Sequence, residues 1–192
     1  MITVIVAVML ATPPPGAAEV QRSRVAQLLD GAYRQVGVTL YYDGAYRAIR
    51  FPGGDVPMER GVCTDVIVRA YRHAGVDLQL LVHRDMSRAF GSYPRLWGLS
   101  RPDPNIDHRR VPNLGTFFKR HGQSVPVTSR PEDYRAGDIV TWRLASGVPH
   151  IGLVSDSLQS GRRLVIHNIG AGVQVEDVLF AYDITGHYRF AP

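Results

Sequence analysis

The C-terminal third of the sequence most constrains the fold, because it consists of short apolar segments separated by turns, most of which contain glycine. Segments of this length that are rich in β-branched residues and bounded by turn residues are typical of strands. Strands that follow one another through short connections pair most simply in an antiparallel sheet. The five predicted strands cover residues 138–144, 150–155, 164–167, 173–178 and 184–190.

The N-terminal half of the sequence has a helical period instead. Apolar residues recur at helical spacing over residues 19–36, 62–74 and 78–86, which predicts three amphipathic helices. Asp77 precedes the third helix as a suitable N-cap, and a fourth, shorter helix is expected over residues 114–120. Helices first and strands afterwards predict an α+β fold, with N-terminal helices packed on a C-terminal antiparallel sheet of about five strands.

Two segments lack a clear period. The tyrosine-rich stretch 41–51 is expected to include a short strand. Residues 92–112 combine several prolines with many polar residues, which indicates a loop. Loops of that length inside a compact domain usually serve function.

The composition is that of an ordinary globular domain. The 192 residues are 45% apolar and 20% charged, which suits one domain with a real core. The net charge of +5 favours anionic partners such as cell-wall polymers or lipid head groups. Because no basic run exceeds a pair of arginines and no zinc-finger or RNP-type motif is present, no nucleic-acid partner is expected.

The first 18 residues resemble a secretory signal. An apolar run over residues 2–11 is followed by three prolines and then by small residues just before Glu19. The run is too short to span a bilayer, so stable membrane insertion is not expected. No Lys or Arg precedes it, and its β-branched residues leave a buried strand as the alternative. We therefore predict a signal peptide over 1–18, a single monomeric domain over 19–192, and a periplasmic or secreted location.

Cys63 is the only cysteine, so no intramolecular disulfide can form. In an oxidising compartment an idle thiol is a liability, which favours a functional thiol over the alternative of a small buried hydrophobe. Cys63 lies in the first turn of the predicted helix 62–74, where free N–H groups and the helix dipole stabilise a thiolate, and Arg60 lies just upstream. We predict that Cys63 is a catalytic nucleophile.

Two histidines are suited to activate this thiol. His150 opens one predicted strand and His167 ends the next, so an antiparallel hairpin brings both to the same end. His150 is the predicted general base and His167 the residue that orients its ring, with Asn168 as an alternative for that third position. Zinc is disfavoured because only one ligand is a thiolate and no paired ligand spacing exists, so no metal and no cofactor are expected.

Five short strings follow one another along the chain: Gly53-Gly54, Cys63-Thr64-Asp65, Ala136-Gly137-Asp138-Ile139-Val140, His150-Ile151-Gly152-Leu153-Val154 and Ile166-His167. Each string alone is weak, while the ordered set is more specific. Over residues 53–167 the chain thereby resembles the NlpC-like cell-wall cysteine peptidases, which have a papain-like fold. More closely, the stretches around Cys63, 105–120 and 167–172 resemble an uncharacterised bacterial family known only as a domain of unknown function.

The chain also departs from that pattern. Val62 precedes the cysteine where the group has Asp, and Thr64-Asp65 follow it in place of Ser-Gly. A tyrosine shortly before the Gly-Gly pair, which the resemblance associates with the oxyanion, is replaced by Arg50 and Phe51. These departures leave the nucleophile and base in place and leave the substrate and oxyanion arrangement open.

Polar residues near these motifs are expected to bind substrate. Each has a structural alternative: an acid in the first helical turn is favourable there, and charged residues in the 92–112 loop can simply be solvated. The predicted substrate-binding residues are Arg60, Thr64, Asp65, Asp107, His108 and Asn168.

The resemblance implies an enzyme, a cysteine hydrolase that cleaves amide bonds in bacterial peptidoglycan or its muropeptide fragments, either as a peptide-stem endopeptidase or as an amidase. Cys63 would form an acyl-enzyme, and backbone N–H groups at the helix start would hold the oxyanion. Three alternatives stay open: an acyl or peptide transferase, an antibacterial toxin that degrades a rival's wall, and an inactive cell-wall-binding module. The departures around Cys63 motivate the last of these.

Overall fold

The computed structural model describes residues 15–190, and the first 14 residues of the predicted signal peptide lie outside this range. The described chain contains four α-helices and eight strands. The helices are α1 (Pro15–Tyr33), α2 (Cys63–His73), α3 (Leu78–Ala89) and α4 (Val111–His121). The strands are β1 (Tyr41–Tyr42), β2 (Arg60–Gly61), β3 (Gln123–Ser124), β4 (Ile139–Arg143), β5 (Pro149–Gln159), β6 (Arg162–Asn168), β7 (Val173–Glu176) and β8 (Asp183–Arg189).

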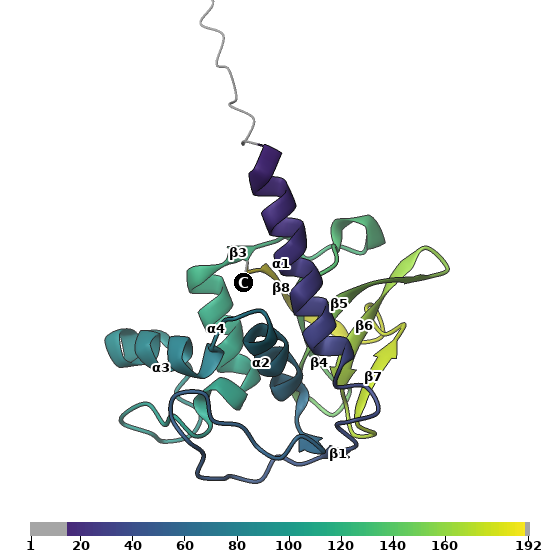
Figure 1. The fold of residues 1–192 in the computed structure, drawn as a ribbon. Helices are drawn as coiled ribbons and strands as arrows, with labels where there is room; N and C mark the ends of the chain where they lie inside the picture. Colours follow the sequence, from purple (N-terminus) through teal and green to yellow (C-terminus); the bar gives the residue numbers. More distant parts are fainter. Residues whose placement is uncertain (1–14, 191–192) are drawn as a thin grey trace, which may run out of the picture.

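The fold is α+β, as the order of periods predicts. Six strands form one antiparallel sheet in the order β3-β8-β4-β5-β6-β7, while β1 and β2 pair separately in parallel. Figure 1 shows α2, α3 and α4 on one side of the molecule and strands β4 to β7 on the other. The core therefore forms where the apolar stripes of the helices meet one face of the sheet.

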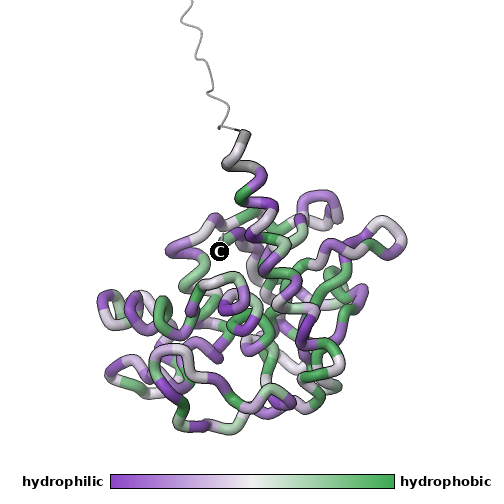
Figure 2. The backbone as a smooth tube through the Cα atoms, viewed as in Figure 1, coloured by the Kyte–Doolittle hydropathy of each residue, from purple (hydrophilic) through white to green (hydrophobic). Residues whose placement is uncertain are grey.

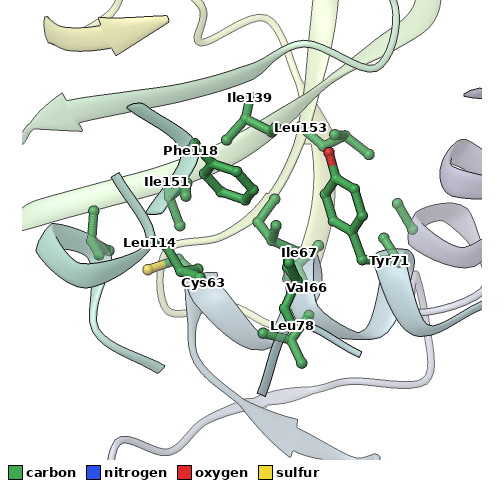
Figure 3. Packing of buried hydrophobic residues seen from close by; sticks show 14 of the residues in the cluster. Cys63, Val66, Ile67, Tyr71, Leu78, Leu114, Phe118, Ile139, Ile151 and Leu153 are labelled. Carbon is green, nitrogen blue, oxygen red and sulfur yellow. The ribbon is translucent and has the colours of Figure 1, made fainter. Parts of the chain in front are cut away.

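Helix α2 is the central helix of this core. Its residues Cys63, Val66 and Ile67 pack in one cluster with Ile151 and Leu153 of β5 (Figure 3). These β5 residues alternate with positions on the opposite face of the sheet, as strand geometry requires. In Figure 2 hydrophobic and hydrophilic residues alternate along the helices and strands, which is the pattern of elements buried on one side.

A second, smaller cluster lies on the other face of the sheet. Trp142, Val154 and Val165 are buried there, and the indole N–H of Trp142 donates to the carbonyl oxygen of Leu179 at 2.9 Å. Both faces of the central strands are thus covered, so β5 and β6 carry continuous apolar runs rather than strict alternation. This double cover gives the hairpin a fixed position against α2.

Strands β5 and β6 form the antiparallel hairpin that the sequence predicts. Leu153 pairs with Ile166, and the chain reverses at Ser160 and Gly161, whose φ values of 51° and 78° are left-handed. Gly161 adopts this conformation without steric cost, which is why the turn forms there. His150 at the start of β5 and His167 near the end of β6 therefore lie at the same end of the sheet.

Two local predictions are corrected by the structure. Helix α4 begins at Val111 rather than at residue 114, because Pro112 in its first turn is pre-organised for a helix start instead of belonging to the loop. The sheet has six strands rather than five, since Gln123–Ser124 pairs with β8. Two polar residues carry no alternation, so no period could predict that strand.

None of the described helices combines the length and the apolar character needed to cross a membrane.

Candidate active site

Cys63 is the first residue of α2 and is only 3% exposed. The helix start is fixed locally, because the carboxylate of Asp65 accepts the backbone N–H of Val62 at 2.7 Å. Figure 3 shows Cys63 at this end of the helix with Leu114 and Ile151 as neighbours. The apolar period that predicts the helix thus also places the thiol at its N-terminus.

The thiol is held in its protonated form by its surroundings. Burial raises the pKa of Cys63 to about 11, and the charge of Asp65 acts in the same direction. The backbone N–H of Ile151 and the hydroxyl of Tyr42 interact with the sulfur and oppose part of this rise. A buried neutral thiol needs a base to take its proton at the moment of attack.

Tyr42 is a site residue that sequence reasoning missed. The comparison of motifs looked for a tyrosine beside Gly53-Gly54 and found Arg50 and Phe51 there. In the structure Tyr42 pairs with Gly61, two residues before the nucleophile, and its hydroxyl interacts with the Cys63 sulfur. Burial, and then the neighbouring Cys63, raise the pKa of Tyr42, so this hydroxyl is a donor at neutral pH. The tyrosine-rich stretch was the only signal for it.

The two predicted histidines are in direct contact. The Nε2 atom of His150 lies 2.8 Å from Nδ1 of His167, and Nε2 of His167 lies 2.9 Å from a carboxylate oxygen of Glu176. The three residues come from the neighbouring strands β5, β6 and β7. His150 and His167 are buried, whereas the side chain of Glu176 is 45% exposed. Glu176 is a second residue that no local motif indicated.

This chain of bonds selects one tautomer of each ring. A carboxylate only accepts, so His167 donates from Nε2 and its Nδ1 carries a lone pair. That lone pair accepts the N–H on Nε2 of His150, which leaves Nδ1 of His150 unprotonated. Burial, and then the charge His167 would carry, lower the pKa of His150 to about 3; burial also lowers the pKa of His167 although Glu176 opposes it. Both rings are therefore neutral at pH 7.

Neighbouring side chains fix the ring of His150. The ring centroid of Trp142 lies 5.8 Å away. Gly152 is required on this face of the sheet, because a Cβ there would come within 2.6 Å of Val165 and within 3.2 Å of the Trp142 ring and of the Cβ of His167. The glycine in the string that opens β5 thus leaves room for the imidazole pair.

In the described residues the Cys63 thiol contacts β5 through the backbone beside His150 and not through the His150 ring. The sulfur interacts with the N–H of Ile151, the residue that follows His150 in β5. Within residues 15–190 the ring of His150 bonds to His167 and not to the sulfur. Proton transfer from Cys63 to His150 is therefore part of the proposed function.

The six predicted substrate-binding residues divide into one exposed and five buried side chains. Thr64 donates to the carbonyl oxygen of Arg109 at 2.9 Å, and Asn168 donates to the carbonyl oxygen of Gly61 at 3.2 Å. Asp65, Asp107 and His108 are also buried. Arg60 alone is exposed, with its guanidinium carbon 5.3 Å from the ring centroid of Tyr41. The five buried side chains are therefore enclosed by the protein, and they stabilise the structure around the site.

Arg109 connects the 92–112 segment to the nucleophile's helix. Its guanidinium binds the carboxylate of Asp65 through two bonds of 2.8 and 2.9 Å, and both side chains are buried. It also donates to the carbonyl oxygens of Asp43 and Ala45. The segment that interrupts the usual motif order thus braces the first turn of α2 and the strand that carries Tyr42. No local pattern reveals a partner 44 positions away.

The fold and this site define an α+β protein in which a buried cysteine begins a helix and a histidine pair stands on the adjoining hairpin. The chain belongs to the family described as Domain of unknown function (DUF1287), whose model matches residues 29–190. This match confirms the predicted membership of an uncharacterised family. The "Uncharacterized protein YijF" of Escherichia coli K12 is 56% identical over 178 residues, which is 92% of this chain and 87% of that protein.

Two solved structures are similar to this chain at low sequence identity. They are NlpC1 from Trichomonas vaginalis, with a TM-score of 0.47, and a Staphylococcus aureus protein described as similar to a lipoprotein of the NLP/P60 family, with a TM-score of 0.49. Each is 15% identical and aligns with 88% of this chain. This chain covers 44% and 42% of theirs, less than half of either, so function is argued below from the site itself.

Proposed function

We propose that this protein is a cysteine hydrolase that cleaves amide bonds in peptidoglycan peptides. The observation that carries the proposal is the chain from Glu176 through His167 to His150, which leaves an unprotonated nitrogen on the residue next to Ile151, and the backbone N–H of Ile151 contacts the thiol. A nucleophile, a base and an orienting group in this relation are the parts that acyl transfer needs. The wall substrate rests on the motif resemblance and on the net charge of +5.

In the first step Nδ1 of His150 takes the thiol proton while the sulfur of Cys63 attacks the carbonyl carbon of the amide. A carbon–sulfur bond forms, and the carbonyl oxygen takes the negative charge. The backbone N–H of Cys63 and the hydroxyl of Tyr42 are the donors proposed for this oxyanion. Because the resting thiol and imidazole are both neutral, proton transfer accompanies attack instead of preceding it.

The intermediate then collapses to an acyl-enzyme. The carbon–nitrogen bond breaks, and the amine leaves with the proton that His150 carries. A water molecule next attacks the thioester carbon while His150 takes a proton from it. The carbon–sulfur bond breaks, a carboxylic acid is released, and the leaving sulfur takes the proton from His150, which restores the thiol of Cys63 and the neutral imidazole. His167 and Glu176 act as positioning residues that keep the base in its reactive tautomer.

We further propose that residues 1–18 direct export and that the domain acts as a monomer in the periplasm or outside the cell. An exported location gives the enzyme access to its wall substrate. Endopeptidase and amidase activities share this mechanism and differ in which amide the cleft accepts.

The decisive experiment is digestion of purified sacculi with wild-type and Cys63→Ala protein, followed by mass spectrometry of the released muropeptides. We expect wild-type protein to release fragments with new amine and carboxyl ends, and Cys63→Ala to release none above background. The masses identify the amide that is cleaved. Release by Cys63→Ala at the wild-type rate would exclude this mechanism.

A second candidate function, an inactive wall-binding module, is favoured by one observation. The Cys63 thiol is buried, has a raised pKa and forms no hydrogen bond with His150 in the described residues. Binding of sacculi by wild-type protein without release of fragments would support this alternative.

A further inference from the structure

A cavity of about 370 Å³ lies between α4 and the strands β4 and β8. Its walls come from the first part of α4, from the end of β4, from the turn before β5 and from β8. This volume is in the range of pockets that hold a small ligand or a few side chains of a peptide. None of the roles described above uses this cavity.

The cavity adjoins the catalytic residues from two sides. Val111 and Gly115 line it, and they flank Leu114, which packs beside Cys63 in the core (Figure 3). Pro149 also lines it and directly precedes His150 in β5. A peptide whose amide lay at the thiol would therefore have an adjacent part within reach of the cavity.

The charge of the lining has one sign. Lys119 and Arg143 are its charged residues, and no Asp or Glu of the described part of the chain lines it. Both side chains are exposed, and neither has an ion-pair partner among the residues that the structure describes. By contrast, Arg109 and Arg189 each bind a buried carboxylate. Two cations without intramolecular partners beside a cavity favour an anionic ligand.

The rest of the lining supplies neutral hydrogen-bonding groups and apolar surface. The hydroxyls of Thr141 and Thr185 lie 3.0 Å apart, and Tyr188 adds a third hydroxyl. Apolar walls with a few convergent polar groups are typical of small-ligand sites. Together with the two cations, this lining suits a peptide that carries carboxylates and short aliphatic groups.

We propose that this cavity is a substrate subsite in which Lys119 and Arg143 bind carboxylates of the peptide next to the cleaved amide. The identity of the ligand rests on the proposed function, because stem peptides of the wall carry free carboxylates. The subsite itself rests on the cavity and its charge. Loss of both cations should weaken binding about tenfold, since each exposed charge pair contributes a modest amount.

Lys119 offers a specific probe, because it is the only lysine in the sequence. Reductive ¹³C-methylation of Cys63→Ala protein labels this side chain and the N-terminal amine. The labelled protein is titrated with an L-alanyl-D-glutamyl stem peptide and with the same peptide after amidation of its carboxylates. We expect the Lys119 signal to shift saturably with the acidic peptide, and the amidated peptide to bind about tenfold more weakly.

Charge variants complete the test by calorimetry. The double variant Lys119→Gln/Arg143→Gln should bind the acidic peptide about tenfold more weakly. The control Arg84→Gln/Arg88→Gln removes the same charge from exposed positions of α3 that do not line the cavity, and should bind like the parent. Equal affinity of the first double variant and the parent, or equal affinity for both peptides, would overturn the subsite.

These outcomes are separable from failure of the hydrolase. Binding that depends on Lys119 and Arg143, with no fragments released by wild-type protein, supports the subsite and removes the proposed activity. Fragment release that depends on Cys63, with affinity unchanged in Lys119→Gln/Arg143→Gln, keeps the activity and removes the subsite.

Discussion

The two ends of the sheet each bury a histidine beside a carboxylate, yet they are built differently. At one end one ring nitrogen of His167 bonds to Glu176, which is 45% exposed, and the other ring nitrogen bonds to His150. At the opposite end His187 bonds to the buried Asp138 at 2.6 Å.

The partners of the two carboxylates explain the difference. Asp138 also receives the guanidinium of Arg189 at 2.7 Å and the backbone N–H of Arg135 at 2.8 Å. The other ring nitrogen of His187 lies 3.4 Å from the carbonyl oxygen of Pro126, so both nitrogens face protein acceptors. Both ring nitrogens of His187 are thus within hydrogen-bond reach of protein oxygens. At the Cys63 end only Nε2 of His150 has a hydrogen-bond partner among the described residues, which leaves the lone pair on Nδ1 for the proposed chemistry.

Removal of each end's histidine should separate chemistry from stability. We expect His150→Asn to lower kcat by about 10³-fold or more, because no other group takes the thiol proton. The matched variant His187→Asn should keep the kcat of the folded fraction while lowering the free energy of unfolding. Muropeptide release per folded molecule checks both, and a large loss of kcat in His187→Asn would erase the contrast between the two ends.

Loss of the carboxylate charge should be costly at the structural end. Asp138→Asn removes the buried negative charge that binds His187 and the partly exposed Arg189, so we expect the free energy of unfolding to fall by about 3 kcal/mol. Urea unfolding followed by circular dichroism measures this change. A loss below about 0.5 kcal/mol, the size expected for exposed pairs, would show that the buried network is not a stabilising feature.

The carboxylate at the catalytic end should affect rate more than stability. We expect Glu176→Ala to lower kcat about tenfold with little change in KM, because His167 and His150 can then adopt the opposite tautomers. Glu176→Gln keeps an acceptor oxygen and should recover most of that loss. Glu132→Ala, at an exposed position in the turn 131–133, is the control. Equal kcat in Glu176→Ala and wild-type protein would exclude the positioning role.

The histidines with lowered pKa should make stability depend on pH. Burial lowers the pKa of His108 to about 4 and that of His150 to about 3. As pH falls below about 6.5 the unfolded chain takes up protons that the folded state refuses, so stability is lost progressively between pH 6.5 and 4. Each histidine should contribute about 1.4 kcal/mol per pH unit in this window. Urea unfolding at pH 7.5 and 5 checks this, and the pH-dependent loss should be smaller in His108→Gln.

Much of the fold and half of the site follow from local pattern. Cys63 precedes an apolar stripe with Asp65 in its first turn, so the helix start and the nucleophile's place are readable from neighbouring residues. The hairpin turn at Gly161 brings His150 and His167 to the same end of the sheet because the two strands it joins run antiparallel. The short strand Gln123–Ser124 had no such signal, whereas the start of α4 at Val111 had one in Pro112, which suits the first turn of a helix.

The sequence by itself therefore determined the order of helices and strands, the helix that begins at Cys63 and the meeting of His150 with His167. Only the tertiary structure decided that Tyr42 lies against the thiol, that Glu176 ends the histidine chain and that Arg109 braces Asp65. The physical reason is the distance along the chain over which each kind of signal acts. Period and turn chemistry act over a few residues, whereas these partners are chosen by which side chains the packed core leaves within reach of a buried group that must be paired.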